Sequence, residues 1–209
     1  MVAQGVEPLP IVGVDSFGIR PDSFVLLLPA ALRPVKRVEF PLTSLSELAK
    51  SDQSLQLVIA GGIIDNDYAA SIRNMLSDKP FVTWLGEVPH ERMGTLYERA
   101  DLVLNCSLSE SMPNSLMEAM ALGRPVLAAN ISGNRSLIHN GINGWLFDGE
   151  DDFRRMVLRI RKSASLRKEA GRRAKEDILT NFSPQTEAES YLSLYQSLVP
   201  VTERQGTVK

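Results

Sequence analysis

Short runs of β-branched and aliphatic residues alternate with longer amphipathic segments from residue 24 onward. This alternation is typical of βαβ units built around a parallel sheet. The predicted strands are 24–29, 55–60, 81–85, 101–105, 125–129 and 144–147. The predicted helices between them are 38–50, 68–76, 90–99 and 115–122. We therefore expect an α/β fold, a Rossmann-like doubly wound parallel sheet of about six strands with helices on both faces.

The two ends of the chain differ from this central pattern. Segments 151–160, 166–179 and 184–198 have helical periodicity, with a break at Phe182, Ser183 and Pro184, which predicts a helical C-terminal extension. Residues 1–23 are rich in glycine and proline and are expected to be a lead-in or linker. Residues 200–209 carry few apolar side chains and are expected to be a disordered tail, so the predicted domain covers 24–199.

Composition excludes several classes of protein. Lysine and arginine number 23 against 25 aspartates and glutamates, so the formal charge is −2 and nucleic acid is not expected as a partner. The single cysteine, Cys106, leaves no intrachain disulfide and fits a reducing, cytoplasmic location. The longest apolar runs, 24–32 and 55–64, have half the length of a membrane-spanning helix, and we expect neither a transmembrane segment nor a secretory signal.

The stretch from Ser107 to Val126 is the most informative part of the sequence. Segment 115–122 is apolar at nearly every position except Glu118, and a carboxylate on such a helix needs a partner, for which an external pair of hydroxyls is one candidate. Glu110 lies eight residues earlier and would face another side of a continuous helix, so we place it in a loop. That loop leads into a helix amino terminus suited to a phosphate, which Asn114 or Ser115 is expected to cap.

This stretch resembles a known family motif. Glu110-x7-Glu118, followed by Ala-Met-Ala-x-Gly-x-Pro-Val, resembles the E-x7-E signature of retaining GT-B glycosyltransferases of group 1, in their C-terminal nucleotide-sugar-binding domain. The resemblance implies that Glu110 contacts the donor sugar and that Glu118 binds the ribose hydroxyls. It also implies that the loop backbone holds the sugar and diphosphate at Ser111, Met112, Pro113, Asn114 and Ser115. The alternative is that Glu110 caps the helix and Glu118 is paired for structural reasons.

A second segment, Pro29-Ala-Ala-Leu-Arg-Pro-Val-Lys-Arg37, resembles the basic turn of the same family, G-R-L-x-x-x-K-G. Lys36 occupies the lysine position, where the resemblance implies a cation that neutralises the donor diphosphate as negative charge builds on it. Ala31 stands where the family has arginine and Arg37 where it has glycine, so Arg33 becomes the candidate second cation. The alternative is a solvated basic turn.

The family layout continues through Gly62 and Gly86, which we assign to the donor site by resemblance; in all, the resemblance covers residues 3–198. Ser136 stands where the family often has glutamate.

Asp65-Asn66-Asp67 is expected to be a capping turn, and we predict no metal site. His90 and His139 are expected to be surface or turn residues, and the Cys106 thiol to be buried and inert. No dinucleotide or P-loop glycine motif is present in the sequence.

The resemblance implies a function. We expect the donor-binding domain of a retaining, hexosyltransferase-type enzyme that moves a sugar from a UDP-, GDP- or ADP-sugar to an acceptor without a cofactor. The family places the acceptor on an N-terminal domain that these residues do not contain, and 1–23 would be the linker from it. The isolated chain is then expected to bind donor but to transfer weakly or not at all. The alternative is a non-catalytic nucleotide-binding or interaction module with the same fold.

Overall fold

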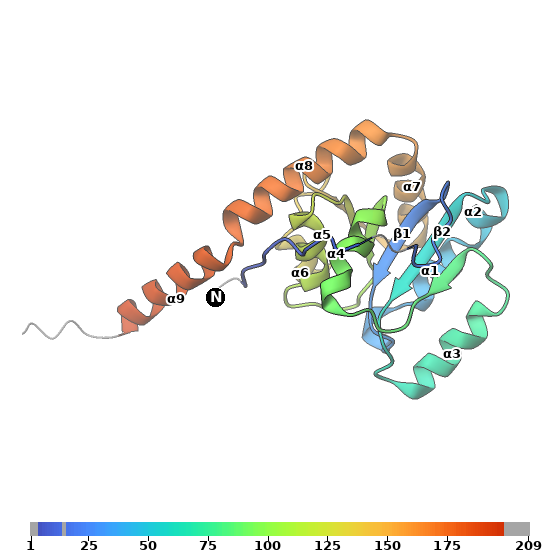
Figure 1. The fold of residues 1–209 in the computed structure, drawn as a ribbon, viewed down its shortest axis with the longest axis horizontal. Helices are drawn as coiled ribbons and strands as arrows, with labels where there is room; N and C mark the ends of the chain where they lie inside the picture. The colour runs from blue at the N-terminus through green and yellow to red at the C-terminus, as the bar shows by residue number, and fades with distance from the viewer. Residues whose placement is uncertain (1–3, 14–15, 199–209) are drawn as a thin grey trace, which may run out of the picture.

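The computed structural model describes residues 4–13 and 16–198. Its centre is a sheet of six parallel strands in the order β3-β2-β1-β4-β5-β6 (Figure 1). The strands are β1 (Phe24–Pro29), β2 (Leu55–Ala60), β3 (Val82–Trp84), β4 (Leu102–Asn105), β5 (Val126–Ala129) and β6 (Trp145–Phe147). The chain fills the sheet outward from β1 in one direction and then from β4 in the other, so the predicted doubly wound sheet is confirmed. Its topological switch point lies between β1 and β4.

Helices cover both faces of the sheet. On one face lie α1 (Glu39–Ser44), α2 (Ser46–Ser51), α3 (Asn66–Leu76) and α7 (Gly149–Arg161), and on the other lie α4 (His90–Arg99) and α5 (Asn114–Ala121). Helix α8 (Ala164–Asn181) contributes to both layers, with Ala170 in the first and Ala174 and Ile178 in the second. Leu26 and Leu28 of β1 pack into the first layer, whereas Val25 and Leu27 pack into the second. A strand buried on both faces needs a continuous apolar run, which is why the pattern of β1 is not alternating.

Two helical segments differ from the prediction. The expected helix 38–50 is divided at Leu45 into α1 and α2. Hydroxyls of Thr43 and Ser46 donate to the carbonyls of Phe40 at 3.0 Å and Leu42 at 2.7 Å, and such local bonds compete with a regular helix. Helix α6 (Ser132–Arg135) was not predicted, because four residues are too few to show a helical period.

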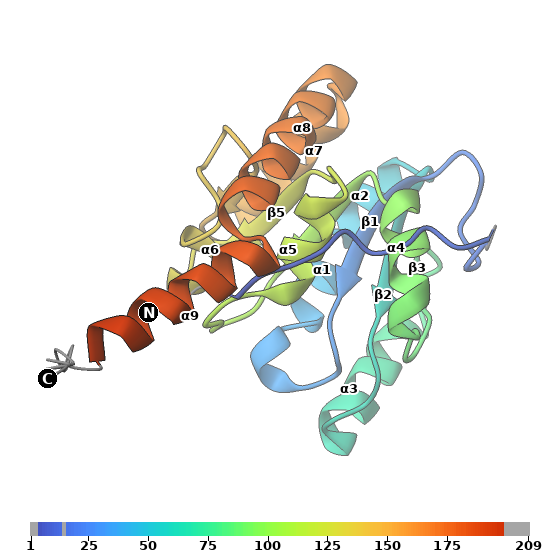
Figure 2. The same cartoon turned by 60° about the vertical axis from the view of Figure 1, so that its left-hand side comes forward.

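The C-terminal helical extension is confirmed. Helix α8 ends at Asn181 and α9 (Pro184–Leu198) follows, with the Ser183 hydroxyl accepting from the Thr186 amide at 3.1 Å. Figures 1 and 2 show α9 projecting away from the sheet, and none of its residues is buried. The predicted tail, 200–209, lies outside the described residues. No helix in the described part of the chain is both long and apolar enough to cross a membrane.

The predicted lead-in is packed against the domain. The amide of Val6 donates to the Phe182 carbonyl at 2.7 Å, and Val12 exchanges two hydrogen bonds with the Thr95 hydroxyl. A side chain at Gly94 of α4 would have its Cβ 2.1 Å from the Pro10 carbonyl oxygen, so only glycine permits this approach. Figure 2 shows the segment running beside α5 and α4. It therefore forms part of the surface around these helices.

Candidate functional site

Lys36 and Glu110 meet at the switch point of the sheet. Lys36 ends the 3-10 helix η1 (Pro34–Lys36), which follows β1, and Glu110 lies in the loop that follows β4. The Lys36 Nζ is 2.5 Å from the Glu110 Oε1, and the two side chains are only 17% and 13% exposed. Open α/β sheets bind ligands outside the carboxyl ends of their strands at this point. The pair therefore marks the position in the fold where a ligand is expected.

A buried polar network fixes the Glu110 carboxylate. Its Oε1 also accepts from the Ser107 hydroxyl at 2.7 Å and from the Asn105 Nδ2 at 3.4 Å. The Asn105 Oδ1 in turn accepts from the Ser107 amide at 3.1 Å and from the Asn134 Nδ2 at 3.3 Å. The Asn134 amide group also donates to the Ala129 carbonyl at 2.9 Å. This network connects the ends of β4 and β5 to Glu110, so the orientation of the carboxylate is set by the sheet.

The same contacts determine the charge of Glu110. Burial raises its pKa, but hydrogen bonds from Lys36 and Ser107, together with the positive charge of Lys36, outweigh burial and bring the pKa below its ordinary value. Glu110 is therefore ionised at neutral pH. An ionised carboxylate can accept hydrogen bonds from hydroxyl groups of a ligand.

The loop that carries Glu110 is held from its other side by α6. A Cβ atom at Gly133 would be 2.2 Å from the Glu110 carbonyl oxygen, so a side chain there is excluded. Gly133 thus lets α6 pack directly against the backbone of this loop.

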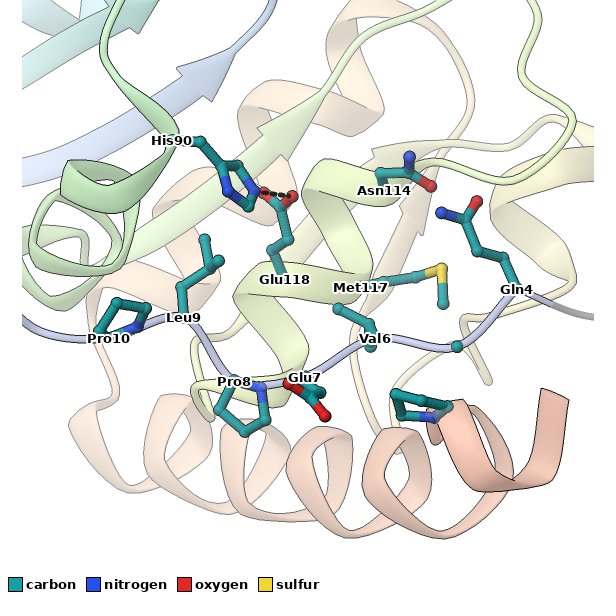
Figure 3. A pocket seen from close by; sticks show the side chains of 12 residues that line it. Gln4, Val6, Glu7, Pro8, Leu9, Pro10, His90, Asn114, Met117 and Glu118 are labelled. Atoms are coloured by element: carbon teal, nitrogen blue, oxygen red, sulfur yellow. Dashed lines mark hydrogen bonds and ion pairs between the residues drawn. The ribbon is translucent and has the colours of Figure 1, made fainter. Parts of the chain in front are cut away.

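Glu118 lies on α5 between two partners from α4. Its Oε2 accepts from the Tyr97 hydroxyl at 2.9 Å, and its Oε1 lies 3.2 Å from the His90 Nε2 (Figure 3). Tyr97 is fully buried; burial and the adjacent Glu118 carboxylate together raise the pKa of its hydroxyl well above the ordinary value. The partner that the sequence required for Glu118 is thus supplied by the protein itself.

A cavity of about 510 Å³ opens beside Glu118. Figure 3 shows its lining, which comprises lead-in residues 4–10, His90, Asn114, Met117, Glu118 and Pro184. Asn114 and Glu118 are the two predicted site residues in this lining, which contains neither Lys36 nor Glu110. The predicted residues therefore form two groups, one at the switch point and one at the cavity. That the lead-in forms a wall of the cavity was not predicted.

The start of α5 differs from the prediction in one respect. The expected side-chain cap at Asn114 or Ser115 is wrong, because Pro113 is the N-cap residue and no side chain caps the helix. Asn114 is the first helical residue, so its side chain lies beyond the capping position. Ser111 is exposed and Met112 is half-buried in the preceding loop. The backbone of 111–115 nevertheless leads directly from Glu110 into a helix amino terminus, as predicted.

The remaining predicted residues lie in other loops at the carboxyl edge of the sheet. Arg33 is exposed at the N-cap of η1, and Arg37 follows Lys36 in the left-handed region at φ 48°, with its guanidinium 4.6 Å from the centre of the Phe40 ring. Gly62 and Gly86 lie in the loops after β2 and β3, which are joined by a 2.7 Å bond from the Gly61 amide to the Gly86 carbonyl. These loops reach the same edge of the sheet as Lys36 and Glu110.

Two of the weaker motifs have structural roles. The Asp65 side chain caps α3 by accepting from the Tyr68 amide at 2.9 Å, which confirms the capping turn. Cys106 is buried, and burial raises the pKa of its thiol, as expected for an inert cysteine. Sequence reasoning missed Tyr97 and the contact of His90 with Glu118. It also missed Asn105, whose position at the end of a strand was the one available signal.

Comparisons with known proteins identify relatives of this chain. A profile of the family described as Glycosyl transferases group 1 matches residues 14–177. The chain is 29% identical over 188 residues to Glycosyltransferase 1 domain-containing protein 1 of Xenopus tropicalis, covering 88% of this chain and 54% of that protein. It is also 29% identical over 194 residues to D-inositol 3-phosphate glycosyltransferase of Rhodococcus opacus, covering 87% and 42%. The chain thus spans about half the length of the curated relatives it matches.

Solved structures share the fold. Anabaena HepE in complex with UDP and glucose superposes with a TM-score of 0.77 at 20% identity, covering 84% of this chain and 49% of that one. Sucrose-phosphate synthase of Thermosynechococcus elongatus gives a TM-score of 0.82 at 19% identity, covering 94% and 52%. The chain therefore has the Rossmann-like fold found in GT-B glycosyltransferases. Because the family profile matches most of its length, the chain belongs to the glycosyl transferases group 1 family, as the spacing of Glu110 and Glu118 indicated.

Proposed function

We propose that this chain is the nucleotide-sugar-binding part of a retaining glycosyltransferase. The observation that carries the proposal is the contact of Lys36 with Glu110 at the switch point, made by loops that follow two neighbouring strands. A cation and a carboxylate placed together can serve the two ends of a sugar diphosphate. The cation attracts the diphosphate, and the carboxylate accepts from sugar hydroxyls.

Lys36 and the backbone of 111–115 are proposed to hold the diphosphate. The amino terminus of α5 supplies amides without intrahelical partners and the positive end of the helix dipole. Arg33, exposed at the start of η1, is proposed as the second cation because Ala31 cannot serve. These charges stabilise the leaving nucleoside diphosphate, on which negative charge builds in the transition state. The loops that carry Gly62 and Gly86 are proposed to flank the same donor.

Glu110 is proposed to orient the donor sugar and Glu118 to accept from the ribose hydroxyls. Glu118 suits this role because its Oε1 lies beside the cavity-lining His90, whereas its Oε2 is held by Tyr97. In this proposal the acceptor hydroxyl attacks the anomeric carbon on the face that the diphosphate leaves, so the configuration of that carbon is retained. The bond to the acceptor oxygen forms as the bond to the diphosphate breaks, and the acceptor proton passes to the departing diphosphate. The acceptor binds to a further domain, as the relatives, about twice as long, suggest. The 209 residues alone then bind donor and transfer weakly or not at all.

Calorimetric titration with UDP-, GDP- and ADP-sugars tests the proposal. Uridine nucleotides come first, because HepE of Anabaena was solved with UDP and with UDP-glucose. We expect saturable binding of one nucleotide class, weakened at least about tenfold by Glu118→Ala and by Lys36→Ala, since each removes a charged hydrogen-bonding group. Glu169→Ala removes an exposed carboxylate from α8 and is the matched control, with unchanged affinity expected.

Three results would contradict the proposal. A folded sample that binds none of the three nucleotide classes would favour a non-catalytic interaction module instead. Binding that survives both substitutions would place the nucleotide elsewhere on the domain. Efficient transfer to an acceptor by the isolated chain would contradict the assignment of the acceptor to a further domain.

A further inference from the structure

We propose that Tyr97 is a positioning residue for Glu118, holding one carboxylate oxygen so that the other is presented to a ribose hydroxyl; the inference rests on the proposed role of Glu118 in binding the nucleotide. Tyr97 lies near the end of α4, 21 residues before Glu118, and no motif in the sequence identified it.

The two oxygens of Glu118 have different surroundings. The Oε2 accepts from the Tyr97 hydroxyl at 2.9 Å, and Tyr97 is 0% exposed within the apolar layer formed by α4, α5 and the sheet. The Oε1 lies 3.2 Å from the His90 Nε2, and the His90 side chain is 69% exposed and lines the cavity. The Oε2 is therefore held inside the protein by Tyr97, and the Oε1 lies beside His90 at the cavity, where Figure 3 shows this contact.

Burial of the tyrosine makes this arrangement rigid. A buried hydroxyl that loses its partner cannot be solvated, so Tyr97 is constrained to keep its bond to the carboxylate. Glu118 is itself only 17% exposed, which leaves its side chain few alternative orientations. A carboxylate fixed by one oxygen loses little further freedom when the other oxygen accepts from a ligand. Tyr97 is thus expected to increase affinity specifically through the hydroxyl that Glu118 recognises.

His90 is the second neighbour of Glu118 and plays a different part. Its exposed ring can move into solvent, so a ligand hydroxyl can replace it at the Oε1. The buried ring of Tyr97 has no such freedom. The fixed partner and the replaceable partner therefore lie on opposite oxygens of one carboxylate.

The test compares the affinity of the chain for UDP with its affinity for 2′-deoxy-UDP. If calorimetric titration selects another base, the diphosphates of that base are compared instead. We expect the unmodified chain to prefer the ribonucleotide by at least about tenfold. In Tyr97→Phe this preference should fall to about threefold or less, with most of the loss in affinity for the ribonucleotide. In a Glu118→Ala background the same tyrosine substitution should leave the preference unchanged, because its effect passes through Glu118.

Tyr68→Phe is the matched control. The Tyr68 hydroxyl donates to Glu39 on the opposite face of the sheet, so this substitution also removes a phenol hydroxyl bonded to a glutamate. The control should keep the full preference for the ribonucleotide. A purely structural role of Tyr97 would lower the affinity for both nucleotides equally, and an unchanged preference in Tyr97→Phe would overturn the proposal.

A second measurement needs no substitution. The buried Tyr97 hydroxyl proton should exchange slowly enough to be observed by NMR, and saturation with UDP should shift its resonance more than saturation with 2′-deoxy-UDP. Equal shifts would overturn the inference even if the Tyr97→Phe protein failed to fold. Failure of the proposed function is distinguishable, because then the unmodified chain binds neither nucleotide or binds both equally well.

Discussion

Lys36 and Glu110 are separated by 74 residues, yet the Lys36 Nζ and the Glu110 Oε1 are 2.5 Å apart. Parallel strands cause this meeting, because β1 and β4 are neighbours and their carboxyl ends reach the same edge of the sheet. The contact ties the loop after β1 to the loop after β4. A ligand group that binds to Lys36 or to Glu110 must therefore also change the surroundings of the other side chain.

Substitution of Lys36 should reveal this coupling in the free energy of unfolding. Lys36→Ala leaves the mostly buried Glu110 carboxylate without its cation, and we expect a loss of about 2 kcal/mol in a denaturant titration. Glu110→Ala should be costly as well, but the double substitution should cost less than the sum of the two. A matched cycle on the exposed pair Lys50 and Glu47 should show almost no coupling. Additive effects at Lys36 and Glu110 would contradict the energetic importance of the pair.

Acid should remove the contribution of the ionised Glu110 carboxylate to the free energy of unfolding. Its pKa is lower in the folded chain than the ordinary value of 4.5, because hydrogen bonds from Lys36 and Ser107 and the positive charge of Lys36 together outweigh its burial. A lowered pKa stabilises the fold above the unfolded value, and that stabilisation is lost as the pH falls through the folded value. The free energy of unfolding of the unmodified chain should therefore fall more steeply below pH 4.5 than that of Glu110→Gln.

Added salt distinguishes the contribution of Glu110 to the pH dependence of stability from the contribution of surface carboxylates. Exposed Glu169 also has a lowered pKa, about 2, through Arg172 and Arg173. Its contribution to the pH dependence should be reduced by added salt, whereas that of the partly buried Glu110 should be largely retained. Identical pH profiles for the unmodified chain and Glu110→Gln would show that Glu110 does not have a lowered pKa.

The sheet could be predicted from the sequence because its strands are short apolar runs buried on both faces. Leu26 to Leu28 of β1 and Leu57 to Ile59 of β2 are all essentially unexposed, so no other environment suits them. Glu110 and Glu118 could be singled out because their spacing excludes a common helix face and matches a family motif. Lys36 was identified by resemblance, but its bond to Glu110 was not, since no local pattern specifies which loops meet.

The features that the sequence did not indicate depend on contacts between segments that are distant along the chain. Tyr97 has the same helical spacing as Met93 and Leu96, so its pattern predicts an ordinary core residue. The lead-in lacks any periodicity, and its place along α4 depends on the absence of a side chain at Gly94. The error at the start of α5 arose because Asn114 has the right residue type for a cap but stands one position too late, after Pro113.

Arg37 should destabilise the turn that carries Lys36. It adopts φ 48° and ψ 49°, a left-handed conformation that costs a residue with a Cβ atom about 1 kcal/mol relative to glycine. Arg37→Gly and Arg37→Ala both remove the contact of the guanidinium with the Phe40 ring. The glycine variant should therefore be more stable than the alanine variant by about 1 kcal/mol in thermal or denaturant unfolding. Equal stability would mean that the turn relaxes to another conformation.

Two adjacent glycines should respond very differently to alanine. A Cβ at Gly61 would be 2.1 Å from the Ala30 carbonyl oxygen, whereas a Cβ at Gly62 would meet only the Glu87 side chain, at 3.4 Å. Gly61→Ala must therefore displace the backbone after β1 or β2 and should cost about 2 kcal/mol or more in the free energy of unfolding. Gly62→Ala should change it by less than about 0.5 kcal/mol. A tolerated Gly61→Ala would contradict the close approach of these loops.

Thr95 should hold the lead-in against α4. Its hydroxyl accepts from the Val12 amide at 2.8 Å and donates to the Val12 carbonyl at 2.9 Å, and the residue is 5% exposed. Thr95→Val keeps the shape of the side chain but removes both bonds, so the Val12 amide should lose its protection in hydrogen exchange. Because residues 4–10 form a wall of the cavity beside Glu118, nucleotide affinity should change in the same variant. Thr43→Val removes hydroxyl bonds within α1, on the other face of the sheet, and should leave Val12 protected. Unchanged exchange at Val12 in Thr95→Val would show that other contacts suffice to hold this segment in place.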